Sequence, residues 1–227
     1  LLEGTVLQAR FSRNLWSKWY LGLTVRYLDV SQSLGTDIID NDFNLLPNIS
    51  SLGVGLNLDY DSRDMPSNPY GGRYLELRAM HSGQSNSEAD PYQSYYARFR
   101  SYHSLRDSMV FAWEVNACAK DGQIPLWDTC RLGLRGFPGT DYLSKESIYA
   151  QAEFRWRFHK RWGMVAFGGA GRVNGAFLNI GEDKTVPSYG VGIRFMVLES
   201  QRINVRVDYA RSDHGNEAWY LSVTEAF

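Results

Sequence analysis

The chain of 227 residues carries 24 basic and 25 acidic side chains, so its formal net charge is only −1. Such a balance argues against a nucleic-acid partner, which would require a basic surface. No run of about 18 apolar residues occurs, which excludes a transmembrane helix. A transmembrane β-barrel is not excluded, because only every second residue of its strands meets lipid. The chain begins with Leu and shows no signal peptide, as expected of a processed or trimmed segment.

Alternation of apolar and polar residues predicts β-strands along most of the chain. In the clearest segment, 148–158, Phe154 and Trp156 face one way while Glu153 and Arg155 face the other. Eleven such segments can be read, and none has the periodicity of a helix. In chain order the expected strands are 4–12, 19–27, 52–61, 74–79, 95–100, 109–117, 148–158, 164–173, 189–195, 203–209 and 217–227.

The connections between these segments alternate between short and long. Short ones are expected at 13–17, 103–108, 159–161 and 198–201, and long ones at 31–48, 82–91, 120–146 and 174–184. A proline-rich turn at 63–72 falls on the side of the short ones. Bacterial outer-membrane barrels show this asymmetry between their two ends. Aromatic residues near strand ends would form the interfacial girdles of such a barrel: Trp19, Tyr60, Trp156, Trp162, Trp219 and Phe227.

Two architectures fit the alternation. A soluble sandwich or a lipocalin-like barrel would bury the apolar faces inside, whereas a membrane barrel would turn them outward. The loop asymmetry favours a transmembrane, antiparallel, up-and-down β-barrel that forms one domain over residues 1–227. The first readable strand would begin at the end with the long loops. Because bacterial barrels usually have an even number of strands, we expect about 12.

The two cysteines, Cys118 and Cys130, lie close together in sequence. A disulfide between them fits an exported protein and would close the base of the 120–146 loop, contributing about 2–4 kcal/mol. Two free, buried thiols are the alternative.

The order Leu134-Arg135-Gly136-Phe137, followed on the next strand by Glu153-Phe154-Arg155, resembles the signature of the BamA/TamA superfamily, also called the bacterial surface antigen family. In that family an Arg-Gly-Phe tip lies on a long extracellular loop folded back into the barrel. The segments 54–77, 189–195 and 203–210 also look like family strands and turns. The final residue, Phe227, is similar to the C-terminal signal by which such barrels are assembled.

The resemblance implies an integral protein of the bacterial outer membrane, with loop 120–146 inside the lumen and Leu134–Phe137 at its tip. Glu153 would face the lumen and pair with Arg135, since a guanidinium and a carboxylate form bidentate hydrogen bonds. At Gly169 the family usually has an Asp, so the pairing network would be thinner here or would use another acid, such as Glu114 or Asp208. A strand buried in the lumen is the alternative to the arginine loop.

The family relationship further implies a role in outer-membrane protein insertion and assembly or in polypeptide translocation. The expected partners are outer-membrane phospholipid and lipopolysaccharide, a client outer-membrane or exported polypeptide, and a second copy of the chain in a homo-oligomer. The chain is shorter than usual family barrels and shows no periplasmic delivery domains. A passive pore, a membrane anchor or an oligomeric scaffold without insertase activity is therefore the alternative function.

An outer-membrane enzyme such as a phospholipase would need Ser, His and an orienting Asn or Asp at one site. The four histidines are His81, His103, His159 and His214, and none belongs to such a constellation in the sequence. We expect no enzyme activity, no cofactor and no metal site.

Overall fold

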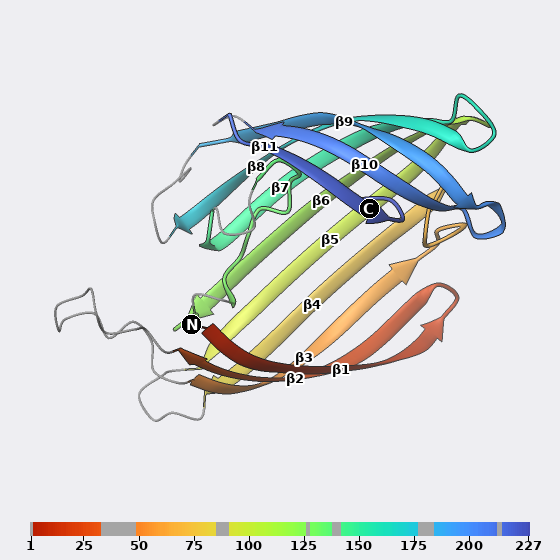
Figure 1. Cartoon of the computed structure of the whole chain (residues 1–227). Helices are drawn as coiled ribbons and strands as arrows, with labels where there is room; N and C mark the ends of the chain where they lie inside the picture. The colour runs from red at the N-terminus through yellow and green to blue at the C-terminus, as the bar shows by residue number, and fades with distance from the viewer. Residues whose placement is uncertain are drawn as a thin grey trace.

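The computed structural model describes residues 2–32, 49–84, 91–125, 128–137, 142–176, 184–212 and 215–227. These residues form one antiparallel sheet of eleven strands, each paired with its neighbours in sequence (Figure 1). The strands are β1 (Leu2–Trp16), β2 (Trp19–Gln32), β3 (Ile49–Asp61), β4 (Gly72–Gln84), β5 (Tyr92–Arg106), β6 (Met109–Gly122), β7 (Ser144–Trp156), β8 (Trp162–Ala176), β9 (Val186–Leu198), β10 (Ile203–Ser212) and β11 (Glu217–Val223). One short 3-10 helix, η2 (Glu199–Gln201), connects β9 to β10. Within the described ranges no helix has the length and apolar character needed to span a membrane.

The all-β, up-and-down architecture predicted from the alternation is confirmed, and each predicted segment overlaps one strand. Two predicted segments, 148–158 and 217–227, run past the ends of their strands, β7 and β11. Most strands are longer than predicted, because their ends pair through the backbone whatever side chains they carry. For example, β6 continues to Gly122, which pairs with Tyr92, so the loop after it spans 123–143 rather than 120–146. The predicted loops 31–48, 82–91 and 174–184 lie mostly outside the described residues, and a twelfth strand is not among those described.

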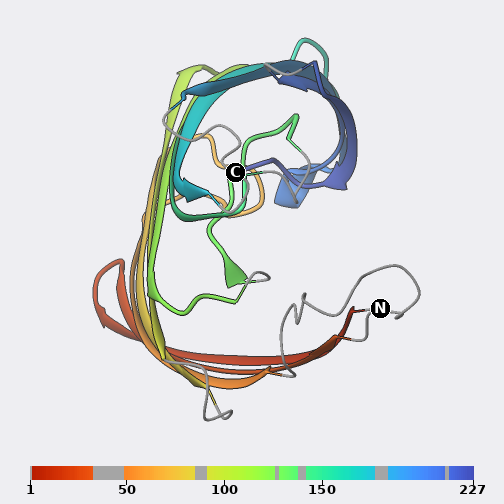
Figure 2. The ribbon, with the colours of Figure 1, turned by 90° about the vertical axis from the view of Figure 1, so that its left-hand side faces the viewer.

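The sheet is strongly curled. Viewed along the strands, it forms an open ring with the loop after β6 and the C-terminus inside it (Figure 2). In the described part of the chain, β1 and β11 are the two edges and are not paired with each other. The turns at 17–18, 107–108 and 157–161 gather at one end, the short-turn end. The opposite, long-loop end holds the start of β1 (Figure 1).

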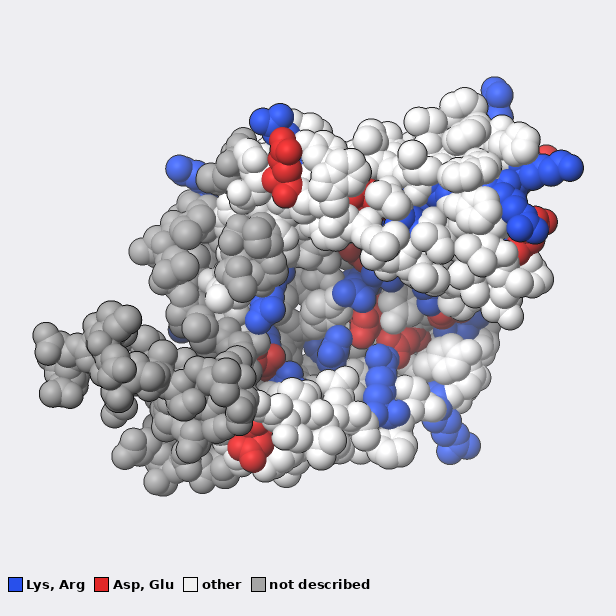
Figure 3. All heavy atoms as spheres, viewed as in Figure 1, with Lys and Arg blue, Asp and Glu red and all other residues white. Residues whose placement is uncertain are grey.

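The two faces of the sheet decide between the soluble and the membrane alternatives. The outward face is apolar and open, with exposed fractions of 60% for Leu56, 55% for Val191 and 77% for Leu221. The inward face carries the charges, and the carboxylates of Glu153 and Asp208 are fully buried. In Figure 3 the basic and acidic side chains gather within the hollow, whereas the walls around it are largely uncharged. Apolar residues outside and charges inside are the arrangement of a membrane barrel.

Aromatic pairs lie near both ends of the wall, as the girdle hypothesis predicted. Trp19 and Tyr60 pack at 5.0 Å between ring centroids near the short-turn end. Tyr209 and Trp219 pack at 5.1 Å near the long-loop end. Amphipathic rings at these depths suit the two membrane interfaces.

The girdle prediction is wrong for Phe227. Its side chain is only 5% exposed and packs inside the lumen against Tyr102 and Ala112. The chain leaves the wall after β11 because Thr224 adopts a left-handed conformation, with φ of 72°, and donates its N–H to the carbonyl of Asn204 at 2.7 Å. The turn directs the last residues inward. Whether Phe227 also acts as an assembly signal stays a prediction.

A charge placed on the outward face should destabilise the barrel according to its depth. We expect Val191→Arg, in the middle of β9, to lower the free energy of unfolding by about 2–4 kcal/mol. Val197→Arg, on the same face one residue before the end of β9, should cost no more than about 1 kcal/mol. Urea titrations of both variants in liposomes measure the difference. Equal costs would contradict a membrane-spanning outer face.

Candidate functional site

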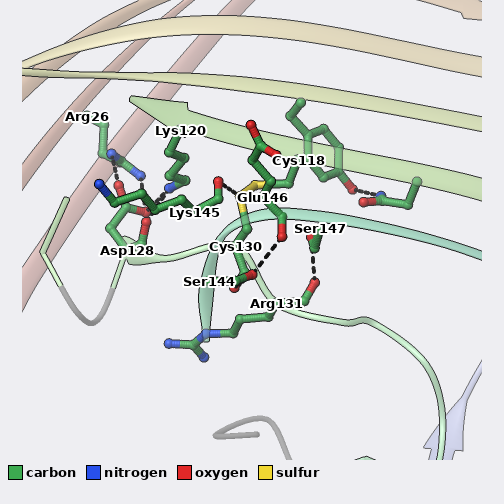
Figure 4. Close-up of a disulfide and its surroundings, with 12 residues drawn as sticks. Arg26, Cys118, Lys120, Asp128, Cys130, Arg131, Ser144, Lys145, Glu146 and Ser147 are labelled. Carbon is green, nitrogen blue, oxygen red and sulfur yellow. Dashed lines mark hydrogen bonds and ion pairs between the residues drawn. A yellow bond between two sulfur atoms is a disulfide. The ribbon is translucent and has the colours of Figure 1, made fainter. Parts of the chain in front are cut away.

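The loop 123–143 is anchored at its base by the disulfide between Cys118 of β6 and Cys130 (Figure 4). Cys130 also forms an isolated β-bridge with Ser144 at the start of β7, with N–O distances of 2.9 and 3.1 Å in the two directions. The structure thus joins the two cysteines that the sequence placed together. The loop is fixed to the inner side of β6 and β7 before it reaches its tip.

A charged cluster around Asp128 holds the same end of the loop. Asp128 accepts hydrogen bonds from Arg26 at 2.7 and 3.1 Å, and Lys120 lies 2.9 Å from its Oδ1 (Figure 4). Tyr92 donates its hydroxyl to Oδ2 at 2.6 Å. Burial raises the pKa of Asp128, but the hydrogen bond from Arg26 and the charge of Lys120 outweigh it and lower this pKa below its ordinary value. The charged form of Asp128 is therefore favoured.

Sequence reasoning missed this cluster. Arg26 and Asp128 are 102 residues apart, and neither belongs to a recognisable motif. The only local signal is that Asp128 lies two residues before Cys130, so a disulfide there would carry it to the wall.

The tip of the loop turns at Arg135 and Gly136. Gly136 has a φ of 97°, a conformation that side chains disfavour, and a Cβ there would lie 3.1 Å from the backbone of Arg211 on β10. Its N–H donates to the hydroxyl of Tyr220 on β11 at 2.8 Å. The carbonyl of Arg135 accepts a hydrogen bond from Ser188 on β9. The tip therefore rests against three neighbouring strands of the wall.

The guanidinium of Arg135 is shared between two acids of the inner wall. Its Nη2 donates to Glu153 on β7 at 2.7 Å, and its Nη1 donates to Asp208 on β10 at 3.1 Å. The guanidinium also lies over the ring of Phe167 on β8, 3.4 Å from the ring centroid. The structure thus places the predicted partner, Glu153, against Arg135. Of the two acids considered as a second partner, it brings Asp208 to the site.

Further arginines balance these two acids. Arg155 lies 2.5 Å from Glu153, while Arg194 and Arg206 each lie 2.5 Å from Asp208. Since an isolated buried charge would cost several kcal/mol, each acid is stable here because it has more than one cationic neighbour. Glu114, the other acid considered, is instead engaged by Arg100, at 2.5 Å, and more distantly by Arg98.

Apolar contacts also hold the loop against the inner wall. On β8, a Cβ at Gly169 would lie 2.9 Å from Leu134, and one at Gly171 would lie 2.8 Å from Leu132. The position where an Asp is usual is thus a glycine that leaves room for a leucine of the loop. Phe137 packs edge-on against Tyr142 at 5.2 Å. The buried apolar cluster under the loop comprises Leu132, Leu134, Phe137, Tyr142, Tyr149, Val173 and Val186.

The proline-rich turn 62–71 covers the lumen at the short-turn end. Arg155 donates to the carbonyl of Pro69 at 3.4 Å, and Arg202 lies 2.5 Å from Asp64. Asp64 also accepts the backbone N–H groups of Tyr70 and Gly71 at 3.0 and 3.2 Å. Burial raises the pKa of Asp64, but the bond from Arg202 and these N–H groups bring it below its ordinary value. The turn therefore connects β3 and β4 to the β9–β10 turn across the lumen.

An outward apolar wall, an inward charged network and an arginine loop folded into the lumen define a transmembrane β-barrel. The Omp85 superfamily domain matches residues 4–227, so the chain belongs to the Omp85 superfamily. This confirms the relationship that the Leu134–Phe137 and Glu153–Arg155 motifs predicted, and with it the location as an integral protein of the bacterial outer membrane.

Solved structures of low identity share the fold. The chain is similar to BamA from Haemophilus ducreyi lacking POTRA domains 1–3, with a TM-score of 0.70, 13% identity and coverage of 98% of this chain and 53% of that chain. It is similar to CdiB from Acinetobacter baumannii, with a TM-score of 0.59, 18% identity and coverage of 98% and 42%. The chain thus spans about half the length of these structures. No curated protein matches its sequence.

Replacing Arg135 should destabilise the folded barrel. Arg135→Ala leaves Glu153 and Asp208 with fewer cationic partners, and breaking a buried pair in this way costs about 3 kcal/mol. The exposed pair Arg161–Glu199 provides the control, because Arg161→Ala should cost less than about 1 kcal/mol. Urea unfolding in liposomes compares them. Equal effects of the two substitutions would contradict a central role for the Arg135 network.

Opening the disulfide should loosen the base of the loop while its tip stays in place. We expect Cys118→Ser combined with Cys130→Ser to lower the free energy of unfolding by about 2–4 kcal/mol and to expose 123–143 to protease. Because Arg135 holds the same loop, adding Arg135→Ala should not be additive. Limited proteolysis and a double-mutant cycle measure this coupling. Simple additivity would show that the two anchors act independently.

Proposed function

We propose that the chain forms the wall and lumenal loop of a machine that inserts polypeptides into the outer membrane or translocates them across it. Membership of the Omp85 superfamily and the likeness in fold to BamA support this proposal. The observation that carries it is the position of the loop tip, where Gly136 contacts Tyr220 on the edge strand β11. The loop is thus in direct contact with the strand at which a client would pair.

The proposed action is mechanical rather than catalytic. An edge strand presents unpaired N–H and C=O groups, which can serve as a template for an incoming strand. β11 is the shortest strand in the described part of the chain, and its pairing with β10 extends over the seven residues 217–223. Outer-membrane lipids would surround the apolar face, and a client polypeptide would pair at the edge.

The test is the folding of a client barrel in liposomes that contain the purified protein. The wild type should accelerate client folding, scored by the resistance of the folded client to heat in a gel. Tyr220→Phe removes the hydroxyl that accepts the hydrogen bond from Gly136, and client folding should be slower with this variant than with the wild type. With Arg135→Ala client folding should be slower still. Arg161→Ala is the control and should behave as the wild type.

The same liposomes distinguish the alternatives. Cross-linking β1 to β11 should abolish acceleration, because a locked edge offers no template. A folded wild type that gives no acceleration, but conducts ions steadily whether cross-linked or not, would sink the insertase proposal in favour of a passive pore. Neither acceleration nor conductance would point to an anchor or scaffold.

A further inference from the structure

A cavity of about 370 Å³ lies in the lumen beside the base of the arginine loop, between the inner faces of β4, β5 and β6. One acid and five basic side chains line it. The acid is Asp128, and the basic residues are Arg26, Arg78, Arg98, Lys120 and Arg131. Asp128 is bound by both Arg26 and Lys120 (Figure 4), so the acid of the lining is outnumbered even by its immediate partners. The cavity is therefore electropositive.

Two of these arginines are held side by side on one aromatic ring. The guanidinium carbons of Arg78 and Arg98 lie 4.9 and 5.1 Å from the ring centroid of Tyr96. The ring is fixed because Asn116 donates to the hydroxyl of Tyr96 at 2.6 Å. Glu76 is the acid that both arginines share, at 3.1 and 3.7 Å. Arg98 also lies 3.6 Å from Glu114, but Glu114 is held more closely by Arg100, at 2.5 Å, so the two adjacent arginines retain attraction for a further anion.

The lining also carries hydrogen-bond donors with no acceptor. Among the described residues, the buried Nε atoms of Arg26 and Arg78 and the buried hydroxyl of Ser94 have no hydrogen-bond partner. The Nε of Arg98 has Glu114 at 3.6 Å, which is beyond hydrogen-bond distance. A buried donor without an acceptor costs on the order of 1–3 kcal/mol. Three such atoms on residues that line one cavity indicate a site suited to a ligand rich in acceptor oxygens.

We propose that this cavity binds the phosphate group of a small phosphorylated solute, with the guanidinium groups of Arg78 and Arg98 as its principal contacts. Guanidinium groups match the geometry of phosphate oxygens and bind them through paired hydrogen bonds. The cavity is about ten times the volume of one water molecule, so it has room for a sugar attached to the phosphate. Tyr96 and Tyr149 in its lining offer aromatic surface to that sugar.

The test is calorimetric titration of the refolded protein in detergent micelles with glucose 6-phosphate, inorganic phosphate and glucose. Glucose 6-phosphate should bind most tightly, inorganic phosphate more weakly, and glucose not at all. Arg78→Gln and Arg98→Gln should each weaken binding of the sugar phosphate about tenfold or more. Arg13→Gln removes the same charge from β1, outside this lining, and should leave the affinity unchanged.

Ser94→Ala is the milder companion variant, since it removes one donor and no charge. It should weaken binding several-fold in a barrel that keeps the wild-type resistance to heat. Failure of the folded wild type to bind any phosphate would overturn the proposal. So would binding that is unaffected in the folded Ser94→Ala, Arg78→Gln and Arg98→Gln variants, or equal affinity for glucose.

Discussion

The ion pairs of the buried Arg135 guanidinium are the interactions on which the structure inside the lumen depends. The guanidinium is only 7% exposed, and it joins the fully buried acids Glu153 and Asp208 on strands that are not adjacent. Charges in such a place must be matched in position as well as in number. The backbone shows the consequence at Gly192, where a Cβ would lie 1.9 Å from the carboxylate of Asp208. Only glycine leaves room at that position for the network.

The same constraint extends around the inner wall. Asp59 on β3 pairs with Arg10 on β1, Glu76 with Arg78 on the same strand, and Glu114 on β6 with Arg100 on β5, so acids and arginines neutralise one another along the inner wall. In a soluble barrel these positions would be apolar, and no such network would be needed. The barrel is stable in lipid because its apolar residues face outward and its inner charges satisfy one another.

The strands and their two faces could be predicted from the sequence, because the alternation of apolar and polar residues is a local property of each strand. The sequence also placed Glu153 on the lumenal face and left Asp208 as one of two acids for Arg135. Contacts across the lumen could not be read, because they depend on the curvature of the sheet. Arg26 meets Asp128 over 102 positions, and Phe227 turns inward through the backbone of Thr224. Neither the contact nor the turn produces a periodic pattern in the sequence.

The anchors of the loop differ in strength, and this difference indicates which part can move. A disulfide holds the base to β6, and buried ion pairs hold the tip to β7 and β10. Toward β11 the loop makes the hydrogen bond from Gly136 to Tyr220, an interaction worth about 1 kcal/mol. Strand β11 is itself paired over a shorter register than β10 is with β9. Movement at this edge of the sheet should therefore begin with β11. The loop stays fixed to β6, β7 and β10, and so preserves the position at which β11 can dock again.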